Sequence, residues 1–172
     1  MIIFNHMRPT FNFLLSHPAH FIALGFGSGL APRAPGTAGT LLAWALYPLI
    51  KTPVSDVVFL AFLASLFVAG VIAAERTGRA LGVPDHGAIV WDEMVAMWLV
   101  LLFTPKTLLW QLTAVVLFRF FDIVKPQPIR WADRQLKGGF GVMFDDIIAA
   151  GYAILVLAVL VHFVGDATWM QP

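Results

Sequence analysis

Long runs without Asp, Glu, Lys or Arg alternate along this chain with short polar segments. Five such apolar stretches are each predicted to form a helix: Thr37–Ile50, Val57–Ala74, Met94–Phe103, Thr107–Phe118 and Ile147–Val164. The second and fifth are long enough for the roughly 18 residues of a membrane-spanning helix. The pattern predicts an all-α fold, a polytopic integral membrane helix bundle with about five membrane-embedded helices plus interfacial helices.

The third and fourth stretches are too short to span a bilayer by themselves. They become long enough if their helices extend through Trp91–Glu93 on one side and through Arg119–Asp122 on the other. The segment between them, Thr104-Pro105-Lys106, is typical of a tight turn. With a rise of about 1.5 Å per residue, such a helical hairpin brings the charged side chains of both extensions to a similar depth at its open end.

The composition supports a membrane protein. Hydrophobic residues make up 59% of the 172 residues and charged residues only 12%, against about 25% in a typical soluble domain. We expect a single domain over residues 1–172. The net charge of +1 gives no reason to expect a nucleic-acid partner. The absence of cysteine excludes disulfides, thiolate zinc sites and a cysteine-nucleophile phosphatase.

The distribution of basic residues predicts the topology. If the first span runs from inside to outside, only Lys51 and Lys106 of the 11 Lys and Arg residues fall outside. This is a strong positive-inside bias. The same assignment places seven acidic residues inside: Asp85, Asp92, Glu93, Asp122, Asp133, Asp145 and Asp146. Nearly all the polar chemistry is therefore expected at the cytoplasmic surface.

Two acidic pairs are the candidate metal ligands. Asp92-Glu93 begins one apolar run, and Asp145-Asp146 directly precedes another. Mg²⁺ prefers a few carboxylates together with phosphate and water oxygens. Adjacent helical residues point about 100° apart, so one member of a pair can bind metal while the other braces a neighbour. Alternatively, these acids only cap helix N-termini. Two pairs at one surface, near many cations, favour the metal site.

Basic residues near the acidic pairs are candidates for binding phosphate. Arg119, Asp122 and Lys125 have helical spacing and share one face. Arg119 and Lys125 can contact phosphate while Asp122 orients them or holds metal, or the three can form a purely structural salt-bridged ladder. Arg130 lies in the predicted interfacial helix that follows. It is a further candidate, although attraction to anionic lipid head groups explains it equally well.

Residues 25–40 are rich in glycine and end where a helix is predicted to begin, near Thr37. Glycines and a helix N-terminus let backbone amides approach a phosphate closely, so Ser28 and Thr37 are candidate substrate contacts. Close helix packing through small residues is the alternative. His86 is either a general acid or base, or a loop residue hydrogen-bonded to Asp85.

Four dense motifs resemble the phosphatidylglycerophosphatase A family. They are GFGSGLAPRAPGTAGT at 25–40, DHGAIVWDE at 85–93, RFFDIVKPQPIRWADR at 119–134 and GGFGVMFDDI at 138–147. The resemblance covers most of residues 21 to 151. Ala96 and Ala150 stand where glycine is common in the family, and each adds only a methyl group.

The resemblance implies a magnesium-dependent phosphatase of the bacterial inner membrane, with several spans and a cytoplasm-facing site. Its substrate would be phosphatidylglycerophosphate, a phospholipid, and its product phosphatidylglycerol. The family's acidic motifs match at Asp92, Glu93, Asp122, Asp145 and Asp146. Direct attack by water and a covalent aspartyl-phosphate both remain open, and the oligomeric state is not predicted. The rival function is a non-catalytic transporter or ion-binding scaffold, because intramembrane acids also mark ion pathways.

Overall fold

The computed structural model describes residues 8–52 and 54–164, and these residues form helices and connecting loops without a β-strand. The prediction of an all-α chain is confirmed. In chain order the elements are α1 (Phe11–Leu15), α2 (Pro18–Ala23), the 3₁₀ helix η1 (Gly25–Leu30), α3 (Pro35–Lys51), α4 (Asp56–Leu81), α5 (Trp91–Leu102), α6 (Leu108–Val124), α7 (Ile129–Gln135) and α8 (Gly138–Val164).

Two of the described helices are long and apolar enough to cross a membrane. α4 has 26 residues and includes an 18-residue stretch with a mean hydropathy of 2.7, and α8 has 27 residues and includes an 18-residue stretch with a mean hydropathy of 2.6. The helices α3 and α6 have 17 residues each, and α5 has 12. By length and composition, α4 and α8 are therefore consistent with a membrane protein.

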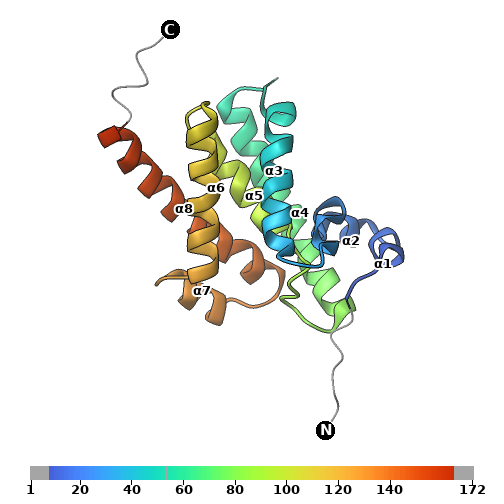
Figure 1. Cartoon of the computed structure of the whole chain (residues 1–172). Helices are drawn as coiled ribbons and strands as arrows, with labels where there is room; N and C mark the ends of the chain where they lie inside the picture. The colour runs from blue at the N-terminus through green and yellow to red at the C-terminus, as the bar shows by residue number, and fades with distance from the viewer. Residues whose placement is uncertain (1–7, 53, 165–172) are drawn as a thin grey trace.

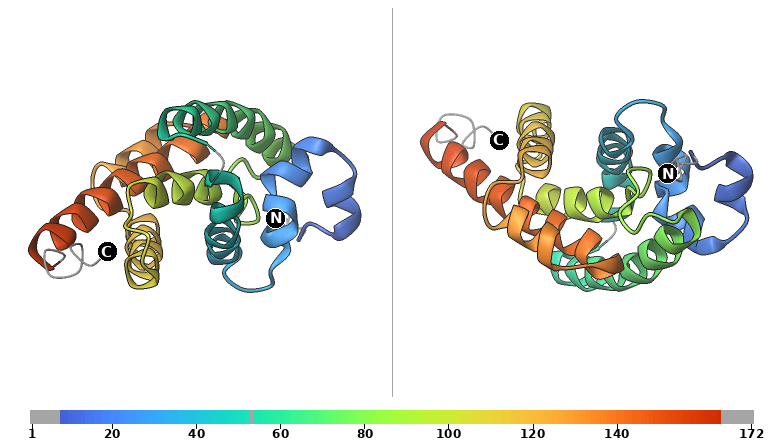
Figure 2. Two further views of the ribbon diagram at one scale, coloured as in Figure 1. Left: turned by 90° about the horizontal axis from the view of Figure 1, so that it is seen from above. Right: turned by 90° about the horizontal axis from the view of Figure 1, so that it is seen from below.

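The short helix α5 lies at the centre of the fold and is almost wholly buried. It packs against α3, α4, α6 and α8, and α8 in turn contacts α4, α6 and α7 (Figures 1 and 2). Because α5 is covered by its neighbours, its first turn lies among side chains from several helices. This arrangement places the acidic start of α5 inside the protein.

The structure confirms the extended hairpin and corrects the start of the last helix. α5 includes Trp91–Glu93 and α6 includes Arg119–Asp122, as predicted. The last helix was predicted over Ile147–Val164, and this start is wrong because α8 already begins at Gly138. The alternative in which Asp146 only caps a helix N-terminus is therefore excluded, since a helix cap lies at the first turn.

The early start of α8 has a tertiary cause. A side chain at Gly139 would collide with the backbone of Val71 and Glu75 in α4, so glycine lets the two helices approach closely. The Gly139 N–H also donates to Glu75 Oε2 at 2.7 Å. Glu75 therefore satisfies one of the free N–H groups at the start of α8, a role that normally falls to a residue next to the helix in sequence.

Candidate active site

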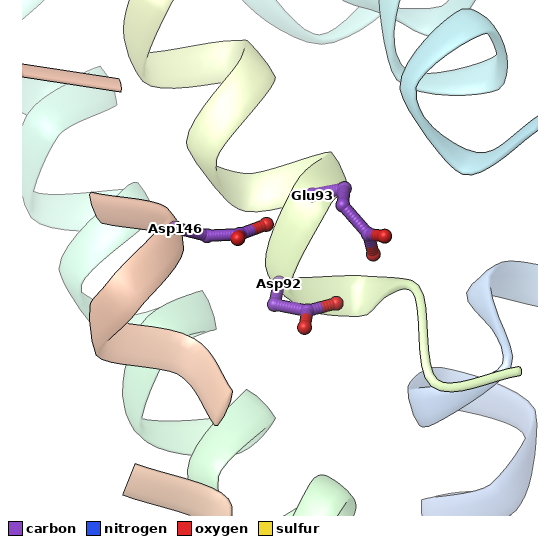
Figure 3. Close-up of side chains that lie close together, drawn as sticks. All are labelled: Asp92, Glu93 and Asp146. Atoms are coloured by element: carbon purple, nitrogen blue, oxygen red, sulfur yellow. The ribbon is translucent and has the colours of Figure 1, made fainter. Parts of the chain in front are cut away.

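Three carboxylates meet where the first turn of α5 lies against α8. Asp92 and Glu93 belong to α5 and Asp146 belongs to α8, and one oxygen of each lies within 4.8 Å of the other two. We call these three residues the carboxylate cluster. Figure 3 shows Asp146 pointing from α8 towards the start of α5. Asp92 and Asp146 are buried, with 8% and 3% of their surfaces exposed. The cluster thus joins one member of the second acidic pair to both members of the first.

Each member of the carboxylate cluster has a buried oxygen without a hydrogen-bond partner among the described residues: Asp92 Oδ1, Glu93 Oε2 and Asp146 Oδ2. Burying a carboxylate oxygen without a partner is costly, and adjacent like charges increase the cost. A divalent cation would supply both the missing partner and the missing charge. Three hard oxygen donors are the type of ligand that Mg²⁺ prefers, so the residues fit this metal.

Arg119 lies beside the carboxylate cluster and is held by two acids. Its Nη1 group is 2.6 Å from Asp122 Oδ2 and 3.4 Å from Glu93 Oε1. Asp122 is three residues along α6, so the predicted shared face is confirmed for Arg119 and Asp122. It is wrong for Lys125, which follows the last residue of α6 in a left-handed backbone conformation. Arg119 Nε is buried and has no hydrogen-bond partner within the described part of the chain. The side chain is therefore oriented by carboxylates, with one N–H available to an incoming anion.

The N-terminus of α3 reaches the same place through Gly36, the second residue of that helix. A side chain at Gly36 would collide with Glu93 Oε1 and would lie in tight contact with the guanidinium of Arg119. The first N–H groups of a helix carry a partial positive charge that favours anions. Thr37 is the next residue of α3. Sequence reasoning named the glycine-rich segment but missed Gly36, for which the Pro-Gly pair at the helix start was the available signal.

Ser28, by contrast, is engaged within its own turn. Its Oγ donates to the Gly25 carbonyl at 2.8 Å, inside η1. The side chain therefore supports the local fold of the glycine-rich segment.

Lys125 ends α6 and links three elements. Its Nζ is 2.6 Å from Asp133 Oδ1 in α7 and 2.5 Å from Asp145 Oδ2 in α8. Burial alone would lower the pKa of Lys125, but these two acids outweigh it and raise the pKa above its ordinary value. Lys125 therefore stays cationic. Sequence reasoning did not identify Asp133 as a partner.

The two members of the second acidic pair have different partners. Asp146 belongs to the carboxylate cluster, whereas the adjacent Asp145 contacts Lys125. This agrees with the angle of about 100° expected between neighbouring helical residues.

Two other candidates, one in a loop and one in α7, make hydrogen bonds to nearby backbone groups. His86 Nδ1 accepts a hydrogen bond from the Ala88 N–H at 3.1 Å, in the loop between α4 and α5. The exposed Arg130 donates through Nη2 to the Val124 carbonyl at 3.4 Å. Neither side chain belongs to the carboxylate cluster, and their proposed roles stay predictions.

Comparison with known proteins identifies the family of this chain. The sequence model described as phosphatidylglycerophosphatase A matches residues 21–161. The chain is 45% identical over 152 residues to a phosphatidylglycerophosphatase A from Haemophilus influenzae, covering 87% of this chain and 93% of that relative. It is 41% identical over 153 residues to a phosphatidylglycerophosphatase A from Escherichia coli, covering 88% of this chain and 86% of that relative. No solved structure matches the chain.

Proposed function

This chain belongs to the phosphatidylglycerophosphatase A family, and on that premise we propose that it removes the terminal phosphate of phosphatidylglycerophosphate in a magnesium-dependent hydrolysis. The products are phosphatidylglycerol and inorganic phosphate. The observation that carries the proposal is the carboxylate cluster, with three unpaired buried oxygens beside an arginine. Membership in a phosphatase family favours this function over a transporter or an ion-binding scaffold.

Some residues of the site would bind the metal ion and others would bind the phosphate group. Asp92, Glu93 and Asp146 would hold Mg²⁺, which when bound neutralises phosphate charge and lowers the pKa of a bound water. Arg119 donates its free Nε–H to a phosphate oxygen and stabilises the charge that develops on the transferring group. Asp122 keeps the guanidinium in place through its 2.6 Å ion pair.

The N-terminus of α3 completes the phosphate side of the site. Gly36 lets the helix start approach Glu93 and Arg119 without a side chain in between. The partial positive charge at the N-terminus of α3 would then face the phosphate. Lys125 acts on this site through Asp145, because their ion pair restrains the turn of α8 that carries Asp146. Lys125 is thus a positioning residue here, alongside its candidate role in substrate binding.

We further propose that the protein is a multi-pass protein of the bacterial inner membrane with its site facing the cytoplasm. The helices α3, α5 and α6 would join α4 and α8 to give about five membrane-embedded helices, since 17 residues reach the lower limit for a span. Lys51 and Lys106 line one hollow of about 500 Å³, so the two cations predicted to lie outside do share one end of the protein.

The function is tested by phosphate release from purified protein in detergent. We expect inorganic phosphate from phosphatidylglycerophosphate with Mg²⁺, loss of release in EDTA, and recovery when Mg²⁺ is restored in excess. Other lipid phosphomonoesters serve as the substrate comparison. Full activity in EDTA would remove the metal from the proposal, whereas no release from any lipid phosphomonoester would favour the scaffold.

The topology is tested with single-cysteine reporters, which are simple to place because the chain has no cysteine. Reporters at Lys51 and Lys106 are expected to react with an impermeant thiol reagent in intact cells. A reporter at Lys137 is expected to react only after the membrane is opened. Labelling of the Lys137 reporter in intact cells would place the site on the other side.

A further inference from the structure

An apolar groove of about 420 Å³ lies along α4 and α8, and Val95 and Leu99 of α5 also line it. Its walls include Leu60, Ala64 and Val68 from α4, and Phe140, Phe144 and Ile147 from α8. Phe144 and Asp146 are two residues apart in a helix, so their side chains point about 160° apart. On α8 the groove therefore lies on a different face from Asp146. No residue of the carboxylate cluster lines it, and its size is that of a ligand site.

A cationic pocket of about 530 Å³ continues the groove. It contains Arg76, Arg79 and Lys137 together with Glu75, and it shares Phe140 with the groove. Along α4 the two are joined by one ridge of residues at intervals of four: Phe67, Val71, Glu75 and Arg79. The groove and the pocket thus form one continuous surface that is apolar at one end and basic at the other.

The length of this surface along α4 is close to the thickness of the hydrocarbon core of a bilayer. From Leu60 to Arg79, α4 rises roughly 28 Å, close to the hydrocarbon thickness of about 30 Å. Arg76, Arg79 and Lys137 lie at the end predicted to be cytoplasmic. Basic residues just beyond a membrane helix attract anionic lipid head groups, by about 1 kcal/mol each.

The charges in the pocket are only partly neutralised. Arg79 is 2.6 Å from Glu75, and Glu75 also accepts the N–H of Gly139. Within the described residues, Arg76 and Lys137 form no ion pair, although Lys137 Nζ lies 3.5 Å from the Asp133 carbonyl. Both side chains are exposed. The pocket therefore keeps an excess of positive charge next to an apolar groove.

We infer that this surface binds an anionic diacylglycerophospholipid, with an acyl chain in the groove and the head-group phosphate on Arg76 and Lys137. The inference rests on the membrane insertion proposed above, but not on the reaction. The site is distinct from the substrate site because none of Asp92, Glu93 and Asp146 lines the groove or the cationic pocket. Its occupant is a structural lipid of the membrane, selected by charge.

Dioctanoyl phosphatidylserine and dioctanoyl phosphatidylcholine are suitable probes, because neither carries a terminal phosphomonoester. Lipid binding to protein in neutral detergent is measured by native mass spectrometry. The double variant Arg76→Gln/Lys137→Gln removes two basic residues, each of which contributes about 1 kcal/mol to the binding free energy. It should therefore bind phosphatidylserine roughly 30-fold more weakly than the parent. Binding of phosphatidylcholine should weaken much less, because its choline cation offsets the charge of its phosphate. The matched control, Arg33→Gln/Arg134→Gln, removes two exposed arginines outside the pocket and should bind like the parent.

Equal losses in both double variants, or no loss in the pocket variant, would overturn the inference. A second measurement uses the parent protein and so does not depend on how the variants fold. Phosphatidylserine with a photoreactive diazirine in its acyl chain should label α4 between Leu60 and Val68 and α8 between Phe140 and Ile147. Labelling spread evenly over the other apolar helices would also overturn it. Phosphate release from phosphatidylglycerophosphate is measured separately, so failure of the proposed reaction is recognised independently.

Discussion

Asp146→Asn is expected to lower the rate of phosphate release by at least about 100-fold, because it removes a charged ligand from the carboxylate cluster. The substitution keeps the size of the side chain. It also relieves repulsion between buried like charges, so the metal-free variant should unfold at a temperature no lower than the parent. Release assays and thermal unfolding with EDTA and with Mg²⁺ check both parts. The parent should be stabilised by Mg²⁺ and the variant should not.

Asp145→Asn is the matched control, since it makes the same chemical change one residue away. It breaks the ion pair with Lys125 and should therefore reduce stability by about 1–2 kcal/mol. Its stabilisation by Mg²⁺ should persist, because Asp145 is not part of the carboxylate cluster. If Asp145→Asn loses the Mg²⁺ effect and Asp146→Asn keeps it, the two residues have the opposite roles. A fully active Asp146→Asn variant would remove that residue from the metal site.

Gly36→Ala is expected to lower the rate of phosphate release by about 100-fold, the size of effect that a misplacement of about 1 Å can produce. The added methyl group would occupy the space of Glu93 Oε1, so this carboxylate has to move, and with it the contact between Glu93 and Arg119. Alanine is favourable in a helix, so α3 should still form. The rate is measured at saturating substrate and Mg²⁺, together with thermal unfolding.

Gly151→Ala is the control for that substitution. It also adds one methyl group to a helical glycine, but nothing lies within 4 Å of the added atom. This variant should keep parental activity. If both variants are equally active, the start of α3 is not close to the phosphate. If both are equally impaired, the loss has a general cause and the assigned role of Gly36 is wrong.

The helices and the identity of the main site residues follow from local sequence. Apolar runs predicted α3 to α6 and α8, because a chain segment that must satisfy its own backbone in an apolar environment becomes a helix. Spacing placed Arg119 and Asp122 on one face, and the short turn brought them level with Asp92 and Glu93. These positions follow from the helical period and from a short turn between two helices. Both can be recognised from residues that are close together in the sequence.

Only the tertiary structure decided which acids face one another. Asp145 and Asp146 are equivalent in sequence, and the rotation of α8 against α5 and α6 sends one to Lys125 and the other to the carboxylate cluster. That rotation depends on the close contact of Gly139 with α4, and the early start of α8 depends on Glu75, 64 residues away. The approach of Gly36 to Glu93 likewise depends on how α3 packs on α5. Packing between distant helices sets these directions, and a periodic pattern within one helix contains no information about them.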